Sequence, residues 1–358
     1  MYFKSQTLKS LPLASFALLT LSVMVLPAQA QDVSDAMKKA EASYARMNLK
    51  EAASQFREVI RLEPNNAKAH QRLGAVLAAQ EDYETAILEC KTAIKLDNKD
   101  FLPHVILGQI LANKNKIDEA LPEFQEACRL KPTSFRSHMD LGFAYTQAQR
   151  VDEAIAAYKK ASEINPKDPS PFVNVGVLYA QQSKYPQAIE AEQKAITMDK
   201  RIPEAFINLG NIFAESGDSQ QAAQAFKDAL KLVPGHPNAL SGLGWMLEKQ
   251  GDYKGAIENQ RKALKNNPQF SPARRRLATA LAASGDNKQA ENEFKSAIKY
   301  APRDVTAHVE YAQFLEKQGQ TESALSEYKK ALEIKPDSKI AQDAMSKLAK
   351  NGSSGSSK

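Results

Sequence analysis

One spacing recurs through almost the whole chain: chemically equivalent positions lie 34 residues apart. Alanine marks this spacing most strictly, because it occupies the same place in nine consecutive segments: Ala52, Ala86, Ala120, Ala154, Ala188, Ala222, Ala256, Ala290 and Ala324. A second series of alanines, a series of glycines and a series of prolines keep the same register without an insertion. A fixed period of roughly 20–50 residues is typical of repeat proteins, in which each segment forms one supersecondary unit.

Each repeat contains the pattern of two helices joined by a tight turn. In residues 203–236, apolar residues follow Phe206 at helical spacing and define one buried face. Gly217 is placed to end this helix, Asp218 to cap the next one, and Pro234 to stop it. One such hairpin cannot bury its apolar face alone, so neighbouring repeats must stack to form a core. The sequence therefore predicts an all-α solenoid.

The period of 34, the small residues at repeat positions 8, 20 and 27, and the proline at position 32 resemble the tetratricopeptide repeat family. The resemblance covers nine repeats: 33–66, 67–100, 101–134, 135–168, 169–202, 203–236, 237–270, 271–304 and 305–338. It departs from the family at Glu192 and Gln260, which stand where an aromatic residue is usual. The resemblance implies a right-handed superhelix of paired helices. The first helix of each repeat would line a concave groove with its positions 2, 5, 6, 9, 12 and 13.

The N-terminus has the features of a signal peptide. Lys4 and Lys9 precede an apolar run over residues 11–26, and Ala28-Gln29-Ala30 has the pattern of a cleavage site. The run is shorter than the roughly 20 residues that a membrane-spanning helix needs. We therefore predict that residues 1–30 are removed after Ala30, leaving an exported protein, periplasmic or secreted, with no transmembrane anchor after processing.

The C-terminus departs from the repeat pattern. Residues 31–350 are predicted to form the solenoid, and its last segment, 339–350, to be a capping helix. Ile340, Met345 and Leu348 would cover the final repeat. Residues 351–358, which are rich in glycine and serine, are predicted to be a flexible tail.

Motif content and charge argue against several classes of function. The sequence has no nucleophile elbow, zinc-protease motif, Walker loop or dinucleotide-binding glycine pattern, and the repeats leave no room for a separate catalytic domain. We therefore predict that the protein is not an enzyme and needs no cofactor. The formal net charge of +6 gives a weak preference for anionic partners and is far from the basic stripe of a nucleic-acid-binding protein.

The resemblance places a set of polar and aromatic residues in the groove. They are Lys68, Arg72, Arg136, Asn174, Asn208, Asn211, Trp245, Arg275 and Arg276. Asparagine can bind a peptide backbone through its donor and acceptor, arginine can hold carboxylates, and tryptophan is a frequent hot spot. Lys68 and Arg72 resemble part of the family's carboxylate clamp, although Met37 and Glu41 stand where the clamp has Lys and Asn. The predicted partner is a protein or peptide segment, anionic or with a C-terminal carboxylate.

Four histidines share repeat position 4, and three of them are in consecutive repeats: His70, His104 and His138. A metal-binding ladder is one interpretation. Packing is the favoured one, because helices of adjacent repeats lie roughly 10 Å apart, whereas an imidazole nitrogen binds zinc at about 2.1 Å.

The two cysteines, Cys90 and Cys128, fall on the second helices of neighbouring repeats. An exported protein can join such a pair in a disulfide. Both positions are apolar in most other repeats, however, so two buried thiols are the favoured interpretation.

These observations predict an adaptor, scaffold or assembly factor that binds a partner polypeptide in its groove. Two alternatives stay open. One is a metal-binding periplasmic assembly factor, for example in photosystem biogenesis, and it depends on the histidines. The other is a component of an envelope polysaccharide or secretion complex.

Overall fold

The computed structural model describes residues 31–354, all of whose regular elements are helices. The predicted signal peptide lies outside this range. The chain divides into two compact units, Met1–Asn165 and Pro166–Lys358, at the end of the fourth repeat. No helix of the described residues is long and apolar enough to span a bilayer.

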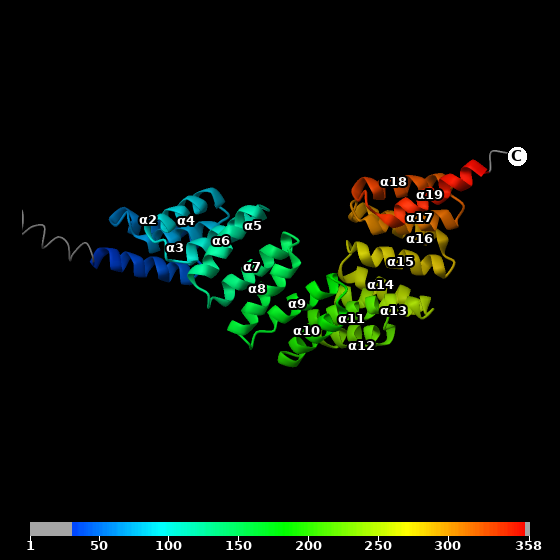
Figure 1. The fold of residues 1–358 in the computed structure, drawn as a ribbon, viewed down its shortest axis with the longest axis horizontal. Coiled ribbons are helices and arrows are strands. Elements are labelled where there is room, and N and C mark those ends of the chain that lie inside the picture. The colour runs from blue at the N-terminus through cyan, green and yellow to red at the C-terminus, as the bar shows by residue number, and fades with distance from the viewer. Residues whose placement is uncertain (1–30, 355–358) are drawn as a thin grey trace, which may run out of the picture. The chain divides into compact units, whose positions relative to one another are not determined.

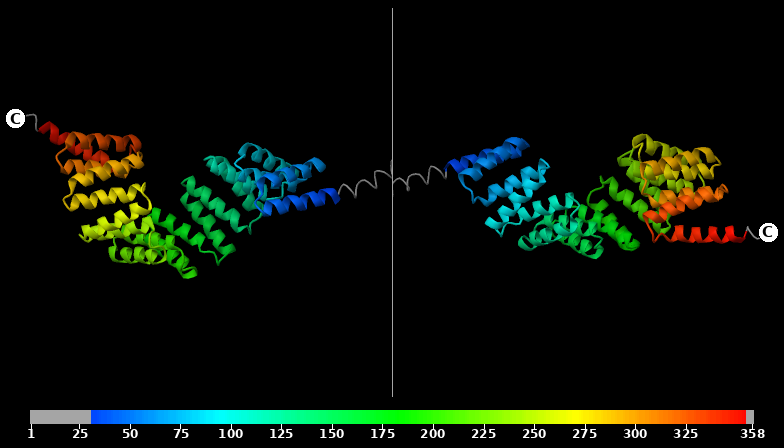
Figure 2. Two further views of the ribbon diagram at one scale, coloured as in Figure 1. Left: turned by 180° about the vertical axis from the view of Figure 1, so that it is seen from behind. Right: turned by 90° about the horizontal axis from the view of Figure 1, so that it is seen from above.

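The first unit contains a helix over residues 31–45 and seven further helices. They are α2 (Leu49–Leu62), α3 (Ala67–Ala79), α4 (Tyr83–Leu96), α5 (Leu102–Asn113), α6 (Ile117–Leu130), α7 (Phe135–Gln147) and α8 (Val151–Ile164). Figure 1 and Figure 2 show consecutive helices running side by side as hairpins within this unit.

The second unit continues the same pattern. Its helices are α9 (Ser170–Gln181), α10 (Tyr185–Met198), α11 (Pro203–Ser216), α12 (Ser219–Leu232), α13 (Pro237–Lys249), α14 (Tyr253–Asn266), α15 (Ser271–Ala283), α16 (Asn287–Tyr300), α17 (Val305–Lys317), α18 (Thr321–Ile334) and α19 (Lys339–Ser354). We call the first helix of each repeat its A helix and the second its B helix. The predicted stack of helix hairpins is confirmed in both units.

The turn between the A and B helices is built as the sequence predicts. Gly217 has φ 94°, which is the left-handed conformation that closes α11. The side chain of Asp218 then accepts a hydrogen bond from the backbone N–H of Gln221 and caps α12. Non-glycine residues adopt the same left-handed conformation at this turn in five other repeats: Met47, Glu81, Asn115, Gln149 and Ser183.

The regular spacing of small residues reflects close contact between the two helices of a repeat. A Cβ atom added to Gly210 would lie 2.7 Å from the ring of Phe226, far inside normal contact distance. Ala222 on the same hairpin has no exposed surface. The glycine and the alanine therefore let the two helices approach closely enough for Phe226 to be fully buried.

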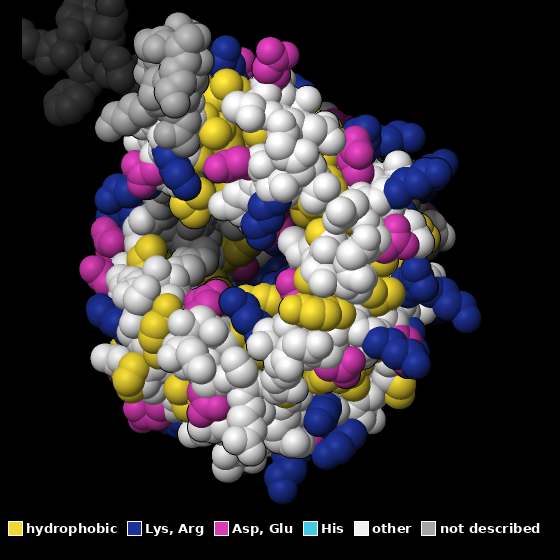
Figure 3. Space-filling view, turned by 90° about the vertical axis from the view of Figure 1, so that its right-hand side faces the viewer, with side chains coloured by type: hydrophobic (Ala, Val, Ile, Leu, Met, Phe, Trp, Pro, Cys, Tyr) yellow, Lys and Arg dark blue, Asp and Glu magenta, His cyan; other side chains and the backbone are white. Residues whose placement is uncertain are grey.

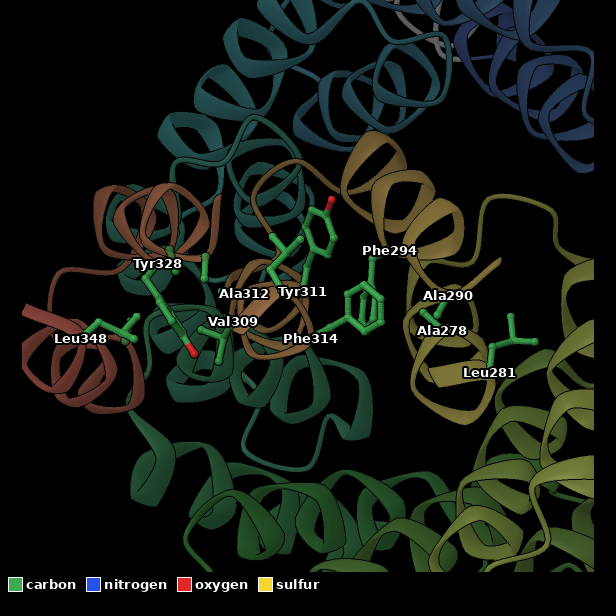
Figure 4. Close-up of a cluster of buried hydrophobic side chains, with 14 of the residues drawn as sticks. Ala278, Leu281, Ala290, Phe294, Val309, Tyr311, Ala312, Phe314, Tyr328 and Leu348 are labelled. Carbon is green, nitrogen blue, oxygen red and sulfur yellow. The ribbon is translucent and has the colours of Figure 1, made fainter. Parts of the chain in front are cut away.

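The core of the last repeats shows how stacking supplies burial. Phe294 of α16 contacts Tyr311 and Phe314 of α17, with ring centroids 5.6 and 5.4 Å apart. Tyr328 of α18 and Leu348 of α19 extend this cluster toward the C-terminus (Figure 4). Each repeat thus buries the apolar face of the next one.

The capping helix differs from the prediction in two respects. Leu348 is buried and Met345 is partly buried, as expected, but Ile340 is 60% exposed. The wrong assignment arose because Ala341, one residue further on, takes the buried place. The helix also continues to Ser354, four residues into the segment predicted to be a flexible tail.

Candidate binding surface on the A helices

A cavity of about 200 Å³ opens between the A helices α9 and α11 of the second unit. Its lining residues are Val177, Ala180, Gln181, Asn208, Asn211, Ile212 and Glu215. All of them except Ile212 occupy repeat positions that the sequence places in the groove. Of the nine predicted groove residues, Asn208 and Asn211 are the two that the structure brings together around this cavity.

Asn208 connects the cavity to a buried carboxyl group. Its Nδ2 donates a hydrogen bond to Oε1 of Glu192 on α10, at 3.0 Å. Glu192 has no exposed surface, and its Oε2 has no hydrogen-bond partner. Burial raises the pKa of Glu192 to about 8, because an ionised carboxylate is poorly solvated there. The sequence already marks Glu192 as unusual, since it occupies the repeat position that Phe226 occupies in the next repeat.

The side chains of Trp245 and Arg276 contact each other. The guanidinium of Arg276 on α15 lies 4.4 Å from the ring centroid of Trp245 on α13, a cation–π contact. Its Nη1 donates to the backbone oxygen of Ser241 at 3.1 Å. Burial lowers the pKa of Arg276 to about 10. Both predicted groove residues are therefore engaged with the protein itself.

Arg275 is also held by the protein. It donates a hydrogen bond to Glu310 on α17 and lies 3.9 Å from a carboxylate oxygen of Asp304. Burial raises the pKa of Glu310, an effect that Arg275 partly offsets. Since only 15% of the Arg275 side chain is exposed, this residue acts as a bridge between A helices.

The predicted clamp of the first unit already contains a carboxylate. Nε of Arg72 lies 2.9 Å, and Nζ of Lys68 3.8 Å, from Oε1 of Glu41. Glu41 is one of the two residues that depart from the family's clamp, and its carboxylate pairs with the two cations that would otherwise hold a ligand.

Arg136 and Asn174 lie away from these clusters. Arg136 is exposed and contacts Asp140 one turn along α7, at 3.3 Å. Asn174 is half-buried on α9 and does not line the cavity.

The histidines at repeat position 4 contact carboxylates and backbone oxygens of the protein itself. Nδ1 of His70, His104 and His308 lies 2.5, 2.7 and 2.6 Å from the carboxylates of Glu89, Glu123 and Glu327. Nε2 of His70, His138 and His308 lies 2.9, 3.0 and 3.1 Å from the backbone oxygens of Pro64, Pro132 and Pro302. Across residues 31–348, no group of three or more ligating side chains that could hold a metal ion is formed.

The cysteines are both free thiols. Cys90 is fully buried on α4, and Cys128 on α6 is partly buried. Burial raises the pKa of each thiol to about 12, so both are poor nucleophiles near neutral pH.

Charges of both signs are mixed on the surface. Figure 3 shows Lys and Arg side chains interspersed with Asp and Glu over the face that it presents. Opposite charges also form short-range pairs along single helices of the first unit, such as Glu58 with Arg61 and Glu126 with Arg129. The face shown thus has no continuous basic field of the kind that nucleic acid needs.

Comparison with protein families identifies the chain. The family model described as the C-terminal domain of cilia and flagella-associated protein 70 matches residues 98–310, more than half of the chain. Two tetratricopeptide repeat models match residues 37–101 and 281–348. The chain belongs to the tetratricopeptide repeat family. Proteins with this fold are in general scaffolds for protein–protein interaction rather than enzymes.

Several solved structures are similar to the chain, and the first of those described next agrees with this fold. A tetratricopeptide repeat protein from Parabacteroides merdae is 16% identical with a TM-score of 0.60, covering 69% of this chain and 98% of that one. PilF of Pseudomonas aeruginosa is 19% identical with a TM-score of 0.49, covering 60% and 97%. YrrB, described as having an unusual peptide-binding site, is 25% identical with a TM-score of 0.37, covering 52% and 97%. No curated protein sequence matches the chain.

Proposed function

We propose that this protein is a non-enzymatic adaptor that binds an extended segment of a partner protein on the A helices of its second unit. The observation that carries the proposal is the cavity between α9 and α11, which A-helix side chains alone line. Asn208 and Asn211 at its wall offer amide groups that donate and accept hydrogen bonds, as a peptide backbone requires. Val177, 37% exposed beside them, offers apolar contact.

A site-specific photo-crosslinker tests this assignment. Placed at Val177, it should capture a partner polypeptide in cells that produce the protein. The matched control is Tyr253, the first residue of the B helix α14, which is almost equally exposed at 36%. A partner that reacts equally from both positions, or only from Tyr253, would place binding elsewhere.

Substitution of Asn208 and Asn211 by alanine is the complementary test. The expected result is loss of the crosslink from Val177 with an unchanged circular dichroism spectrum. Variants at Trp245, Arg275 and Arg276 are less informative, since these side chains contact each other or Glu310 and their removal would disturb the stack.

The cellular site of action is part of the proposal. We propose that the protein acts outside the cytoplasm, on the strength of the basic, apolar and Ala-Gln-Ala segments within residues 1–30. Mass spectrometry of the purified mature protein should find Gln31 as the first residue. An N-terminus at Met1 on the bulk of the protein would contradict this localisation.

A further inference from the structure

We propose that the cavity between α9 and α11 is a subsite for one basic side chain, lysine or arginine, of the bound segment. Glu215 supplies the counter-charge, and Oδ1 of Asn208 accepts a hydrogen bond from the basic group. The proposal rests on the proposed function, because it assumes that a polypeptide occupies the A-helix face. It adds which kind of side chain that face would select.

The size of the cavity fits one side chain. Its volume is about 200 Å³. Pockets for small molecules are larger, roughly 300–1,000 Å³, whereas one liquid water takes about 30 Å³. The space therefore suits a single long side chain that enters from a segment lying across α9 and α11.

The walls of the cavity suit a side chain that is apolar along its length and charged at its end. Val177, Ala180 and Ile212 offer aliphatic surface for methylene groups. Glu215 is the one ionisable residue of the lining, and it is exposed. Within the described part of the chain, no hydrogen bond or ion pair is recorded for Glu215, so its carboxylate is available to a ligand.

The bond to Glu192 sets the orientation of the Asn208 amide. Because Nδ2 points at Oε1 of Glu192, Oδ1 lies on the opposite side of the amide group. Gln181 and Asn211 add further amide oxygens to the lining. The cavity thus combines one carboxylate with several neutral acceptors, which is the complement of an ammonium or guanidinium group.

An acidic side chain does not fit the same place. No lysine or arginine lines the cavity, and a second carboxylate there would be repelled by Glu215. The selectivity is therefore opposite to the anionic partner expected from the net charge and from the predicted arginines. Those arginines are already paired or stacked within the protein.

Selection from a random heptapeptide display library tests the proposal. The wild type should enrich peptides with Lys or Arg at one fixed position. Glu215→Gln should reduce this enrichment by roughly two- to fivefold, since an ion pair of an exposed carboxylate contributes less than the 1.4 kcal/mol that corresponds to tenfold. Glu190→Gln is the matched control, because it removes an exposed charge from the B helix α10, outside the cavity lining, and should leave the preference unchanged.

A second measurement addresses Glu192 as the positioning residue. The best peptide from the selection is compared with its analogue in which norleucine replaces the basic residue. Glu192→Phe restores the aromatic residue of other repeats but removes the acceptor for Asn208, so the affinity ratio of the two peptides should fall. Glu192→Gln keeps an acceptor and should preserve the ratio.

The possible results separate the two proposals. Peptide enrichment without a basic preference, or a preference that survives in Glu215→Gln, overturns the basic subsite and leaves peptide binding intact. An unchanged ratio in Glu192→Phe overturns the positioning role. Failure of the folded wild type to enrich any peptide overturns the proposed function and the subsite together.

Discussion

Asn208 and Glu192 are joined by a hydrogen bond of 3.0 Å that links the surface of the A helices to the interior of the second unit. The carboxyl group of Glu192 is fully buried, and one of its oxygens has no partner. Burial raises its pKa to about 8, so the neutral acid predominates at pH 7. A titrating group in the core makes the stability of the second unit depend on pH.

Replacement of Glu192 by glutamine should remove that dependence. In the wild type the contribution of Glu192 to the free energy of unfolding is most favourable below pH 4.5, where the carboxyl is protonated in both states. Above pH 4.5 the unfolded state ionises while the folded state keeps its proton, so this contribution falls by about 1.4 kcal/mol per pH unit until the folded state ionises near pH 8. Glu192→Gln should therefore be more stable at pH 7 by roughly 2–4 kcal/mol.

Urea unfolding followed by circular dichroism between pH 4 and 9 measures this difference. Glu190→Gln, an exposed change on the same helix, is the control and should follow the wild type throughout. Wild-type and Glu192→Gln stabilities should converge at low pH. Parallel curves across the whole range would show that Glu192 titrates alike in the folded and unfolded states.

Most of the fold is predictable from the sequence because each repeat contacts only its neighbours. The register of Ala222, the close approach at Gly210 and the turn at Gly217 follow from local spacing, and the structure confirms all three. The end of the chain is less predictable. The sequence of α19 departs from the repeat pattern, so repeat spacing does not decide whether Ile340 or Ala341 takes the buried place.

The candidate site is predictable only in part. Asn208 and Asn211, two of the residues that repeat position places in the groove, line the cavity between α9 and α11. The sequence does not show that Arg275 binds Glu310, because a long side chain chooses among several acceptors according to rotamer and burial. Glu215 and Val177 occupy groove positions as well, yet their role depends on a cavity that only packing reveals.

The pairing of repeat positions 4 and 23 allows a test of how the hairpins are held together. His104 on α5 contacts Glu123 on α6 at 2.7 Å, whereas the sixth repeat has Phe206 and Ala225 in the same places. Glu123→Ala and His104→Phe should each cost roughly 1–2 kcal/mol, because each leaves a partly buried polar group unpaired.

The double variant should recreate the apolar pair of the sixth repeat. We expect it to be more stable than the sum of the single effects predicts, by roughly 1–3 kcal/mol. Urea unfolding of the wild type, both single variants and the double variant gives this coupling energy. Strict additivity would show that His104 and Glu123 do not stabilise the hairpin as a pair.

Two substitutions at the left-handed turn should have opposite effects on stability. Gln149 has φ 59° and an exposed side chain, so its Cβ atom is strained in this conformation. Gln149→Gly should stabilise the first unit by roughly 0.5–1 kcal/mol. Gly217→Ala should destabilise the second unit by about 1 kcal/mol, although no atom lies within 4 Å of the added Cβ.

Thermal unfolding of these variants isolates the backbone effect. Gln149→Ala serves as the control, since it shortens the side chain but keeps the strained Cβ atom. Its stability should match the wild type. A gain from Gln149→Ala equal to that from Gln149→Gly would instead assign the effect to the side chain of glutamine.

Trp245 is the only tryptophan of the chain, so its fluorescence reports directly on the contact with Arg276. Removal of the guanidinium in Arg276→Ala should expose one face of the indole to water and shift its emission to longer wavelength. Stability should fall by roughly 1–3 kcal/mol, because the variant loses a cation–π contact and the hydrogen bond to Ser241. Arg136→Ala, which removes an exposed arginine from the first unit, should leave the emission unchanged. An Arg276→Ala spectrum identical to that of the wild type would mean that the guanidinium does not cover Trp245 in solution, and that both side chains are available to a ligand.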